Sequence, residues 1–135
     1  MQTNNIEAII LGRRNIGEAD RLLLMYSKEQ GKIKVIAKGS RKIKSKLASH
    51  IEPFTIGSYY LAEGKSFYIL AGAESMCQNN NLSADLKAYQ DASYLCELLD
   101  LATSEGERNE KLFNAASYII THLNSTTEDK RSILL

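Results

Sequence analysis

A cluster of basic residues follows a short alternating segment in the first half of the chain. The segment from Lys32 to Lys46 reads KIKVIAKGSRKIKSK and passes through Gly39 into a stretch crowded with positive charge. Cations on a flexible loop neutralise phosphates without reading bases, so this pattern is typical of loops that lie along a nucleic-acid backbone. A loop is also often basic because it is solvated and keeps a strand edge soluble. We call residues 38–46 the basic finger; its cations are Lys38, Arg41, Lys42, Lys44 and Lys46.

Two further groups of side chains are candidates for the same surface. The first lies on the adjoining predicted strands and is basic: Arg13, Arg14 and Lys34. The second is aromatic and offers platforms on which unpaired bases stack: Tyr59, Tyr60, Phe67 and Tyr68. Because side chains alternate between the two faces of a strand, about half of the aromatic group must face the core. We expect Tyr59 and Tyr68 to face outward. Three other basic residues of this half have simpler explanations, since Lys28 and Lys65 occupy predicted turns and Arg21 can pair with Asp20 or Glu18.

The sequence contains no arrangement typical of a catalytic centre. The segment GSRK at 39–42 lacks the first glycine and the helix of a Walker phosphate loop, and no Gly-x-Ser-x-Gly motif is present. Glu18 and Asp20 have the spacing of paired carboxylates for acid–base catalysis or metal binding. On a turn between Arg14 and Arg21 they are better explained as turn-forming or ion-paired residues. A binding module is therefore favoured over an enzyme.

Metal and cofactor chemistry has little support either. Cys77 and Cys96 are too far apart for a chelating Cys-x-x-Cys pair, and His50 and His122 have no obvious ligand partners. Cys96 falls within a helical apolar pattern and is best explained as a small core residue. We expect no metal site and no cofactor.

The net charge of +1 conceals an uneven distribution along the 135 residues. Through residue 70 there are twelve basic and six acidic residues, a balance of +6, whereas the remainder has five basic and ten acidic residues, a balance of −5. Such asymmetry suggests that one half faces a polyanion. The longest apolar runs fall far short of the roughly 18 residues that span a membrane, and the first residues lack a secretory signal, so we expect a cytoplasmic protein without a membrane partner.

Short strands are predicted for the first half. They run over Glu7–Leu11, Arg21–Ser27, Lys32–Ala37, a segment that begins at Pro53, and Ser66–Ala73. Glu29–Lys32 has the pattern of a hairpin turn in which Gly31 supplies a positive φ. Five short strands in about 70 residues is the size of a small barrel, of which the OB-fold is the commonest example. We expect a five-stranded antiparallel OB-fold barrel over residues 1–78, with the basic finger joining the third and fourth strands.

Helices are predicted for residues 79–135. Ser83 or Asn81 can cap a first helix, and its apolar stripe is Leu82, Leu86, Tyr89, Ala92, Cys96 and Leu99. A second helix carries the stripe Leu112, Phe113, Ala116, Ile119, Ile120 and Leu123. The two are expected to pack as an antiparallel hairpin. Thr127 can cap a third helix that has barely begun when the sequence ends at Leu135, which suggests that this all-helical part is truncated.

The ordered combination of these motifs resembles the N-terminal part of the RecO family of DNA repair and recombination mediator proteins. The motifs are Gly12-Arg13-Arg14, Gly17-Glu18-Ala19-Asp20-Arg21, Gly31-Lys32 and Ala37-Lys38-Gly39. Ala92–Leu99 resembles the family's first helix after the barrel, and Leu112-Phe113 resembles the start of its next helix. The resemblance covers nearly the whole chain, although family members are roughly twice as long and some carry a zinc-binding cysteine cluster that is not present here.

The resemblance implies an OB-fold followed by a helical domain, without enzymatic turnover of a small molecule. It implies binding of single- and double-stranded DNA, annealing of complementary strands, and work with RecR and single-stranded DNA-binding protein to load RecA in gap repair. The alternatives from the residues alone are an OB-fold module whose basic loop meets an acidic protein tail, and an RNA-binding module of the same barrel type.

Overall fold

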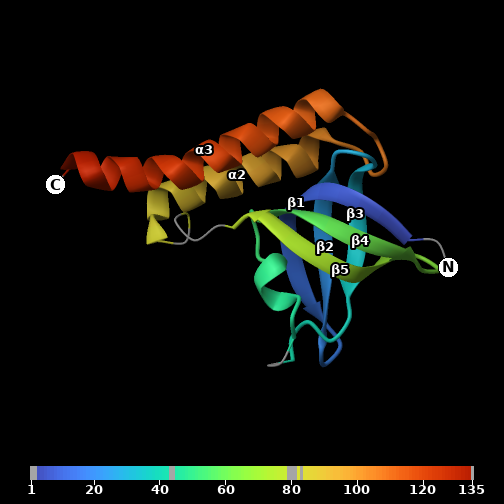
Figure 1. The fold of residues 1–135 in the computed structure, drawn as a ribbon. Helices are drawn as coiled ribbons and strands as arrows, with labels where there is room; N and C mark the ends of the chain where they lie inside the picture. Colours follow the sequence, from blue (N-terminus) through green and yellow to red (C-terminus); the bar gives the residue numbers. More distant parts are fainter. Residues whose placement is uncertain (1–2, 43–44, 79–81, 83, 135) are drawn as a thin grey trace.

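The computed structural model describes residues 3–42, 45–78, 82 and 84–134, with Thr3 and residues 126–134 described as backbone only. Within these residues, five strands form a closed barrel and two long helices lie side by side across it (Figure 1). The strands are β1 (Thr3–Ile16), β2 (Asp20–Ser27), β3 (Gly31–Ala37), β4 (Ile56–Glu63) and β5 (Tyr68–Cys77). The helices are a short 3₁₀ turn, η1 (Ala48–His50), followed by α2 (Leu86–Ala102) and α3 (Glu110–Leu134).

The predicted OB-fold barrel is confirmed, with one correction to strand direction. The strand order around the barrel is β1-β2-β3-β5-β4, and β1 pairs with both β2 and β4. Four of the five seams are antiparallel, but β3 pairs with β5 in parallel, at Val35–Tyr68 and Ile36–Ile69. The correction has a simple reason. A closed ring with an odd number of strands cannot alternate direction all the way round, so one seam must be parallel.

Strand β1 is longer than the predicted Glu7–Leu11 and contains a bulge. Its register against β2 shifts between Ile10 and Gly12, so that Leu11 is an extra residue. A bulge bends a strand and increases its twist, which lets one strand pair along both of its edges as the barrel closes. The predicted hairpin between β2 and β3 is confirmed, with Gly31 at a φ of 70°.

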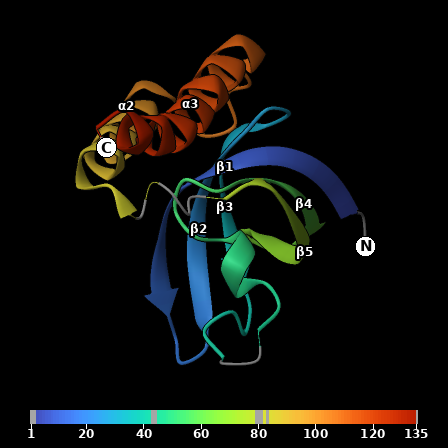
Figure 2. The same cartoon turned by 60° about the vertical axis from the view of Figure 1, so that its left-hand side comes forward.

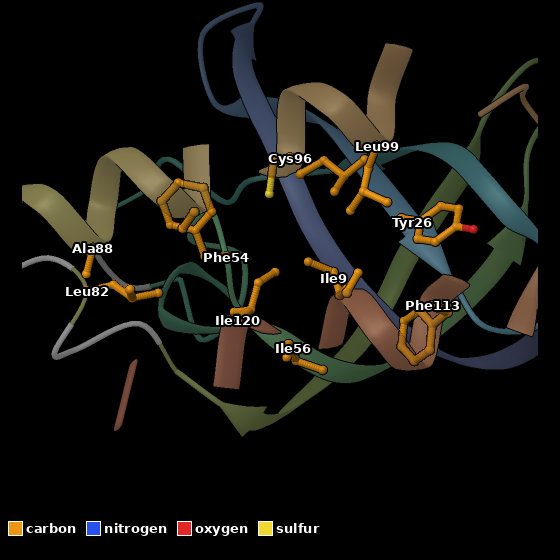
Figure 3. Packing of buried hydrophobic residues seen from close by; sticks show 13 residues of the cluster. Ile9, Tyr26, Phe54, Ile56, Leu82, Ala88, Cys96, Leu99, Phe113 and Ile120 are labelled. Carbon is orange, nitrogen blue, oxygen red and sulfur yellow. The ribbon is translucent and has the colours of Figure 1, made fainter. Parts of the chain in front are cut away.

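Two hydrophobic clusters divide the interior. One fills the barrel and includes Ile10, Leu23, Val35 and Leu61. The other lies between the outside of the barrel and the helices (Figure 3). It is built from barrel residues such as Ile9, Tyr26, Phe54 and Ile56 and from helix residues such as Ala92, Cys96, Leu99, Phe113 and Ile120. Ile9 and Ile10 are adjacent on β1 yet belong to different clusters, because successive side chains of a strand point to opposite faces.

Helix α2 begins later than expected. The predicted caps Ser83 and Asn81 lie outside the described residues, and the cap of α2 is Asp85, whose carboxylate accepts a hydrogen bond from the Ala88 backbone N at 3.1 Å. The buried side of α2 consists of Ala88, Ala92, Cys96 and Leu99. Leu86 is 74% exposed, so its place in the predicted stripe was wrong. Tyr89 is also exposed, although its ring packs edge-on against Phe54 at 5.0 Å.

Helix α3 runs without interruption to Leu134, so the prediction of a third helix capped by Thr127 was wrong. The stretch before Thr127 contains neither glycine nor proline, and nothing in it forces a helix to end. Phe113, Ala116 and Ile120 are buried as predicted, whereas Ile119 is exposed. Among the described residues, no helix has the length and apolar character needed to cross a membrane.

The β2–β3 hairpin holds the connection between the two helices. Lys32 Nζ donates hydrogen bonds to the backbone oxygens of Asp100 and Thr103 at 2.7 and 2.8 Å, and to Asp100 Oδ1 at 3.0 Å. The backbone N of Gly106 donates to the Lys32 carbonyl at 2.9 Å. The C-terminal end of α2 is therefore fixed on the barrel by Lys32 of the hairpin, and the opposite end of the barrel lies away from α2 and α3 (Figure 2).

Candidate nucleic-acid interface

The basic finger lies in the β3–β4 connection, as predicted, and its first residues are tied to the β1–β2 turn. Gly39 N donates to Asp20 Oδ1 at 2.8 Å, and Arg41 N donates to the Ala19 carbonyl at 3.0 Å. Arg41 Nη1 donates to the Gly17 carbonyl at 2.9 Å. Asp20 therefore holds a loop, in agreement with its interpretation as a turn-forming residue. Figure 2 shows this end of the barrel, with the β1–β2 turn and the finger side by side and far from α2 and α3.

The described cations of the finger are exposed. Lys38, Arg41, Lys42 and Lys46 have exposed side chains, and Lys44 lies outside the described residues. The ion pairs found among the described residues are Lys28–Glu110, Lys32–Asp100, Lys87–Asp91 and Arg108–Glu110, and none of them uses a cation of the finger. These side chains are thus available to an external anion. Lys28 was predicted to be only solvated, but its Nζ lies 3.6 Å from Oε1 of Glu110, the first residue of α3.

Two further arginines gather near the finger. The pKa of the Arg21 guanidinium is lowered, first because the group is partly buried and then because the positive charges of Arg13 and Arg41 lie close to it. The acid that opposes this shift is Glu52 rather than the predicted partners Asp20 and Glu18. Three like charges held together raise the local positive potential, and an anion bound there would relieve their repulsion.

The outer face of the sheet extends this positive surface. Arg14 pairs with Leu22 across β1 and β2, and Leu24 pairs with Lys34 across β2 and β3. Directly opposed residues of an antiparallel pair project to the same face. A shallow groove of about 350 Å³ runs over this face, and its lining includes Arg13, Arg14, Leu22, Leu24 and Lys34. The structure thus places the predicted Arg14 and Lys34 on one surface, with apolar side chains between them.

The aromatic residues are arranged differently from the prediction. Tyr59 was expected to face outward but is fully buried inside the barrel, where its hydroxyl donates to the His50 carbonyl at 2.6 Å and burial raises the pKa of its phenol. Tyr68 was also expected to face outward, but it is half-buried and packs against the cluster inside the barrel, and its hydroxyl donates to Gln30 Oε1 at 2.7 Å. Of the four aromatic candidates, Tyr60 and Phe67 are exposed, at 45% and 38%.

A signal for this arrangement was present in the sequence. Tyr59 shares a strand face with Leu61, which is also buried inside the barrel, and Tyr60 lies on the alternate face. An aliphatic residue two positions away marks the inner face more reliably than the tyrosine itself, whose polar tip is compatible with either side.

Other parts of the molecule offer less for an anion. No group of three or more potential metal ligands occurs among the described residues. Cys96 is buried as predicted, and burial raises the pKa of its thiol to about 12. A larger hollow of about 800 Å³ is lined by residues of α2 and of the barrel, and the charged residues of its lining are one base, Arg13, and two acids, Glu97 and Asp100. The strongest candidate for binding a polyanion is therefore the finger with its neighbouring sheet face.

Comparison with known proteins gives a consistent result over the whole chain. A family model described as "Recombination protein O N terminal" matches residues 1–78, and one described as "Recombination protein O C terminal" matches residues 83–135. Relatives named "DNA repair protein RecO" include one from Alkaliphilus metalliredigens, 39% identical over 108 residues, which are 80% of this chain and 44% of that protein. Another, from Thermoanaerobacter sp., is 32% identical over 113 residues, which are 84% of this chain and 46% of that protein.

A third relative of the same name, from Clostridium kluyveri, is 39% identical over 106 residues, which are 78% of this chain and 41% of that protein. The chain thus spans less than half the length of the curated relatives it matches. Two family models that together match residues 1–78 and 83–135 leave few positions unaccounted for. The chain belongs to the RecO family.

Proposed function

We propose that this chain is a DNA-binding protein of DNA repair and homologous recombination that acts without catalysis. The relatives named for DNA repair support the process, and the exposed basic surface supports the nature of the ligand. Within the chain, we propose that residues 1–78 form the OB-fold domain that binds DNA and that residues 79–135 form part of a helical domain.

The observation that carries this proposal is the anchored basic finger. Lys38, Lys42 and Lys46 are exposed on a loop whose base is fixed by Asp20 and Arg41. A fixed base keeps the cations together at one end of the barrel, while the long lysine side chains stay free to follow a phosphate backbone. Contacts of this kind neutralise phosphates without reading bases, so the expected binding is independent of sequence and sensitive to salt.

Such a surface suits strand annealing. Two complementary strands repel each other until their phosphates are neutralised, and they pair only if their bases stay accessible. Mobile lysines that contact the backbone meet both requirements, and they accept single-stranded and duplex DNA alike. The sheet face with Arg14 and Lys34 would continue the path of the strand beyond the finger. The cluster of Arg13, Arg21 and Arg41 would hold a phosphate where the two meet.

The partners proposed for the chain follow from its family. We propose that it acts in the cytoplasm, where it works with RecR and single-stranded DNA-binding protein to load RecA at gaps. The DNA-binding end of the barrel lies away from α2 and α3 (Figure 1), so a protein bound to the helices would not obstruct a strand bound to the finger.

Strand annealing tests the proposal. The informative variant replaces Lys38, Lys42, Lys44 and Lys46 with alanine and keeps Arg41, because Arg41 also holds the loop through Gly17. Annealing of complementary oligonucleotides at moderate salt is expected to slow at least about tenfold, since the backbone contacts are lost. A control with the same change in net charge replaces Lys28, Lys87, Arg108 and Lys111, and it is expected to anneal at the wild-type rate.

Equal annealing by the wild type and the finger variant would remove the finger from the mechanism. Failure of the wild type to bind any oligonucleotide at low salt would favour the alternative of a protein-interaction module. Equal or tighter binding of RNA of the same sequence would favour an RNA-binding module.

A further inference from the structure

A small hollow lies at the far edge of the proposed DNA surface, where the β4–β5 loop meets β3. Its volume is about 210 Å³, well below that of sites for drug-sized ligands. The β4–β5 loop is separate from the basic finger, so the hollow is a second feature of this surface. The residues of its lining that matter for recognition are Lys34, Glu63, Lys65, Phe67, Tyr68 and Glu105.

The walls of this hollow are fixed by the fold. A Cβ on Gly64 would lie 2.4 Å from the Phe67 carbonyl oxygen, so only glycine allows the loop to close so tightly. Tyr68 is paired with Val35 across the parallel seam, and its hydroxyl is hydrogen-bonded to Gln30. The hollow is therefore preformed, which reduces the entropy lost when a ligand enters.

The charges around the hollow differ from those of the finger. Its lining includes two lysines, Lys34 and Lys65, and two glutamates, Glu63 and Glu105, so the formal charges of these four groups cancel. A site for a bare phosphate would carry excess positive charge. Balanced charges beside the exposed ring of Phe67 suit a planar, neutral group that both donates and accepts hydrogen bonds.

An unpaired nucleobase has this chemistry. Its face stacks on an aromatic ring, and its exocyclic amino group donates to a carboxylate. The phosphate attached to it would find a lysine at the rim. The hollow also adjoins the proposed DNA surface, because Lys34 lines both this hollow and the groove that contains Arg14.

We propose that this hollow receives one unpaired base of a DNA strand that lies along the finger and the sheet face, with the base stacked on Phe67. This inference rests on the proposed function, and it adds a means of distinguishing single strands from duplexes. A base in a duplex is stacked and paired, and it cannot enter a hollow of this size without leaving the helix. Phosphate contacts at the finger hold either form of DNA, whereas the hollow favours the single strand.

A fluorescence experiment tests the stacking directly. The chain contains no tryptophan, so Phe67→Trp introduces a single indole at the hollow. Addition of an oligodeoxycytidylate strand of 20 nucleotides, whose bases carry the exocyclic amino group, is expected to quench its emission, because a base stacks on the ring. The matched control is Tyr118→Trp, at a position on α3 that is 73% exposed and lines none of the hollows described above. Its emission is expected to stay constant.

Affinity measurements give the second readout. Phe67→Ala is expected to weaken binding of a mixed-sequence single strand about 5- to 100-fold and to change binding of the matching duplex less than about twofold. The salt dependence is expected to be unchanged, since no phosphate contact is lost. The wild type should bind an abasic strand more weakly than a normal strand of equal length. The ratio of these two affinities should equal the ratio by which Phe67→Ala weakens binding of the normal strand.

The outcomes separate this inference from the proposed function. If the wild type binds DNA but Phe67→Ala weakens single strand and duplex equally, or neither, the hollow is not a base site and the finger proposal stands. The same conclusion follows if the abasic strand binds as tightly as the normal strand. If the wild type binds neither form at low salt, both proposals fail. If RNA quenches the Phe67→Trp emission and DNA does not, the hollow is not a site for DNA.

Discussion

Asp20 and Arg41 show how much the role of a residue depends on its neighbours in space. Both were candidates for direct chemistry, the first as one of a carboxylate pair and the second as a phosphate ligand. Asp20 instead accepts a hydrogen bond from the backbone of the finger, and Arg41 donates to the β1–β2 turn. Because each holds the loop, neither is a clean target for testing DNA contacts alone.

Gly31 gives a test at the residue scale. Its φ is +70°, and a Cβ there would lie 2.1 Å from the Glu107 carbonyl oxygen. Gly17 has a similar φ of +58° but nothing within 4 Å of its Cβ position. Gly17→Ala is therefore expected to lower the free energy of unfolding by about 1 kcal/mol, from backbone strain alone. Gly31→Ala is expected to lower it by at least about 2 kcal/mol more, because the α2–α3 connection must move.

Urea unfolding followed by far-ultraviolet circular dichroism measures both values. Equal losses for the two glycines would mean that the contact between the β2–β3 hairpin and residue 107 contributes nothing to stability.

At the scale of elements, the hairpin, the bulge and the helix end are what join the barrel to the helices. The bulge at Leu11 lets β1 pair with both neighbouring strands. Because successive side chains of β1 point to opposite faces, the strand contributes to the hydrophobic cluster inside the barrel and to the cluster under the helices. The end of α2 is fixed by Lys32, whose ammonium group meets two backbone carbonyls at the negative end of the helix dipole. A side chain from β3 thus caps carbonyls at the end of α2, in addition to the helix's own C-cap residue Thr103, whose hydroxyl donates to the Leu99 carbonyl.

Lys32→Met tests this contact because it keeps the aliphatic stem and removes the three hydrogen bonds to Asp100 and Thr103. The side chain of Lys32 is only 14% exposed, so the expected loss of unfolding free energy is about 1–3 kcal/mol. Lys87 forms an ion pair with Asp91 on the surface of α2 and is 76% exposed. Lys87→Met is the control and should cost less than about 0.5 kcal/mol. Similar costs in urea unfolding for the two variants would contradict a capping role for Lys32.

At the scale of the whole molecule, positive and negative charge are distributed toward opposite ends of the barrel. The excess positive charge of the first half is concentrated at the end of the barrel that carries the finger, and the helices with their excess acid lie across the other end (Figure 2). We therefore expect an approaching polyanion to be attracted to the first end and repelled by the second, which would orient the encounter before contact.

Salt dependence measures this distribution. The slope of log affinity against log salt for a single strand is expected to become shallower by about 0.7 for each finger lysine that contacts a phosphate. Replacement of Lys38, Lys42, Lys44 and Lys46 with alanine should therefore reduce the slope by up to about 3. The control that replaces Lys28, Lys87, Arg108 and Lys111 removes the same charge elsewhere. An equal change of slope in both variants would show that only net charge matters and not the position of the finger.

The sequence by itself determined the number of strands, the barrel, the helical pair and the place of the finger between the third and fourth strands. These features follow from local signals, namely apolar periodicity, turn glycines such as Gly31, and runs of like charge. The buried core residues of α3 and the burial of Cys96 were also within reach of periodicity.

Only the tertiary structure decided the features that depend on closure and packing. Barrel closure with five strands forces a parallel seam, and the strand order places that seam between β3 and β5. The contacts of Asp20, Arg41 and Lys32 each join segments far apart in the chain. No local pattern reveals such contacts, because their energy comes from groups that meet only after the barrel has closed and the helices have packed against it.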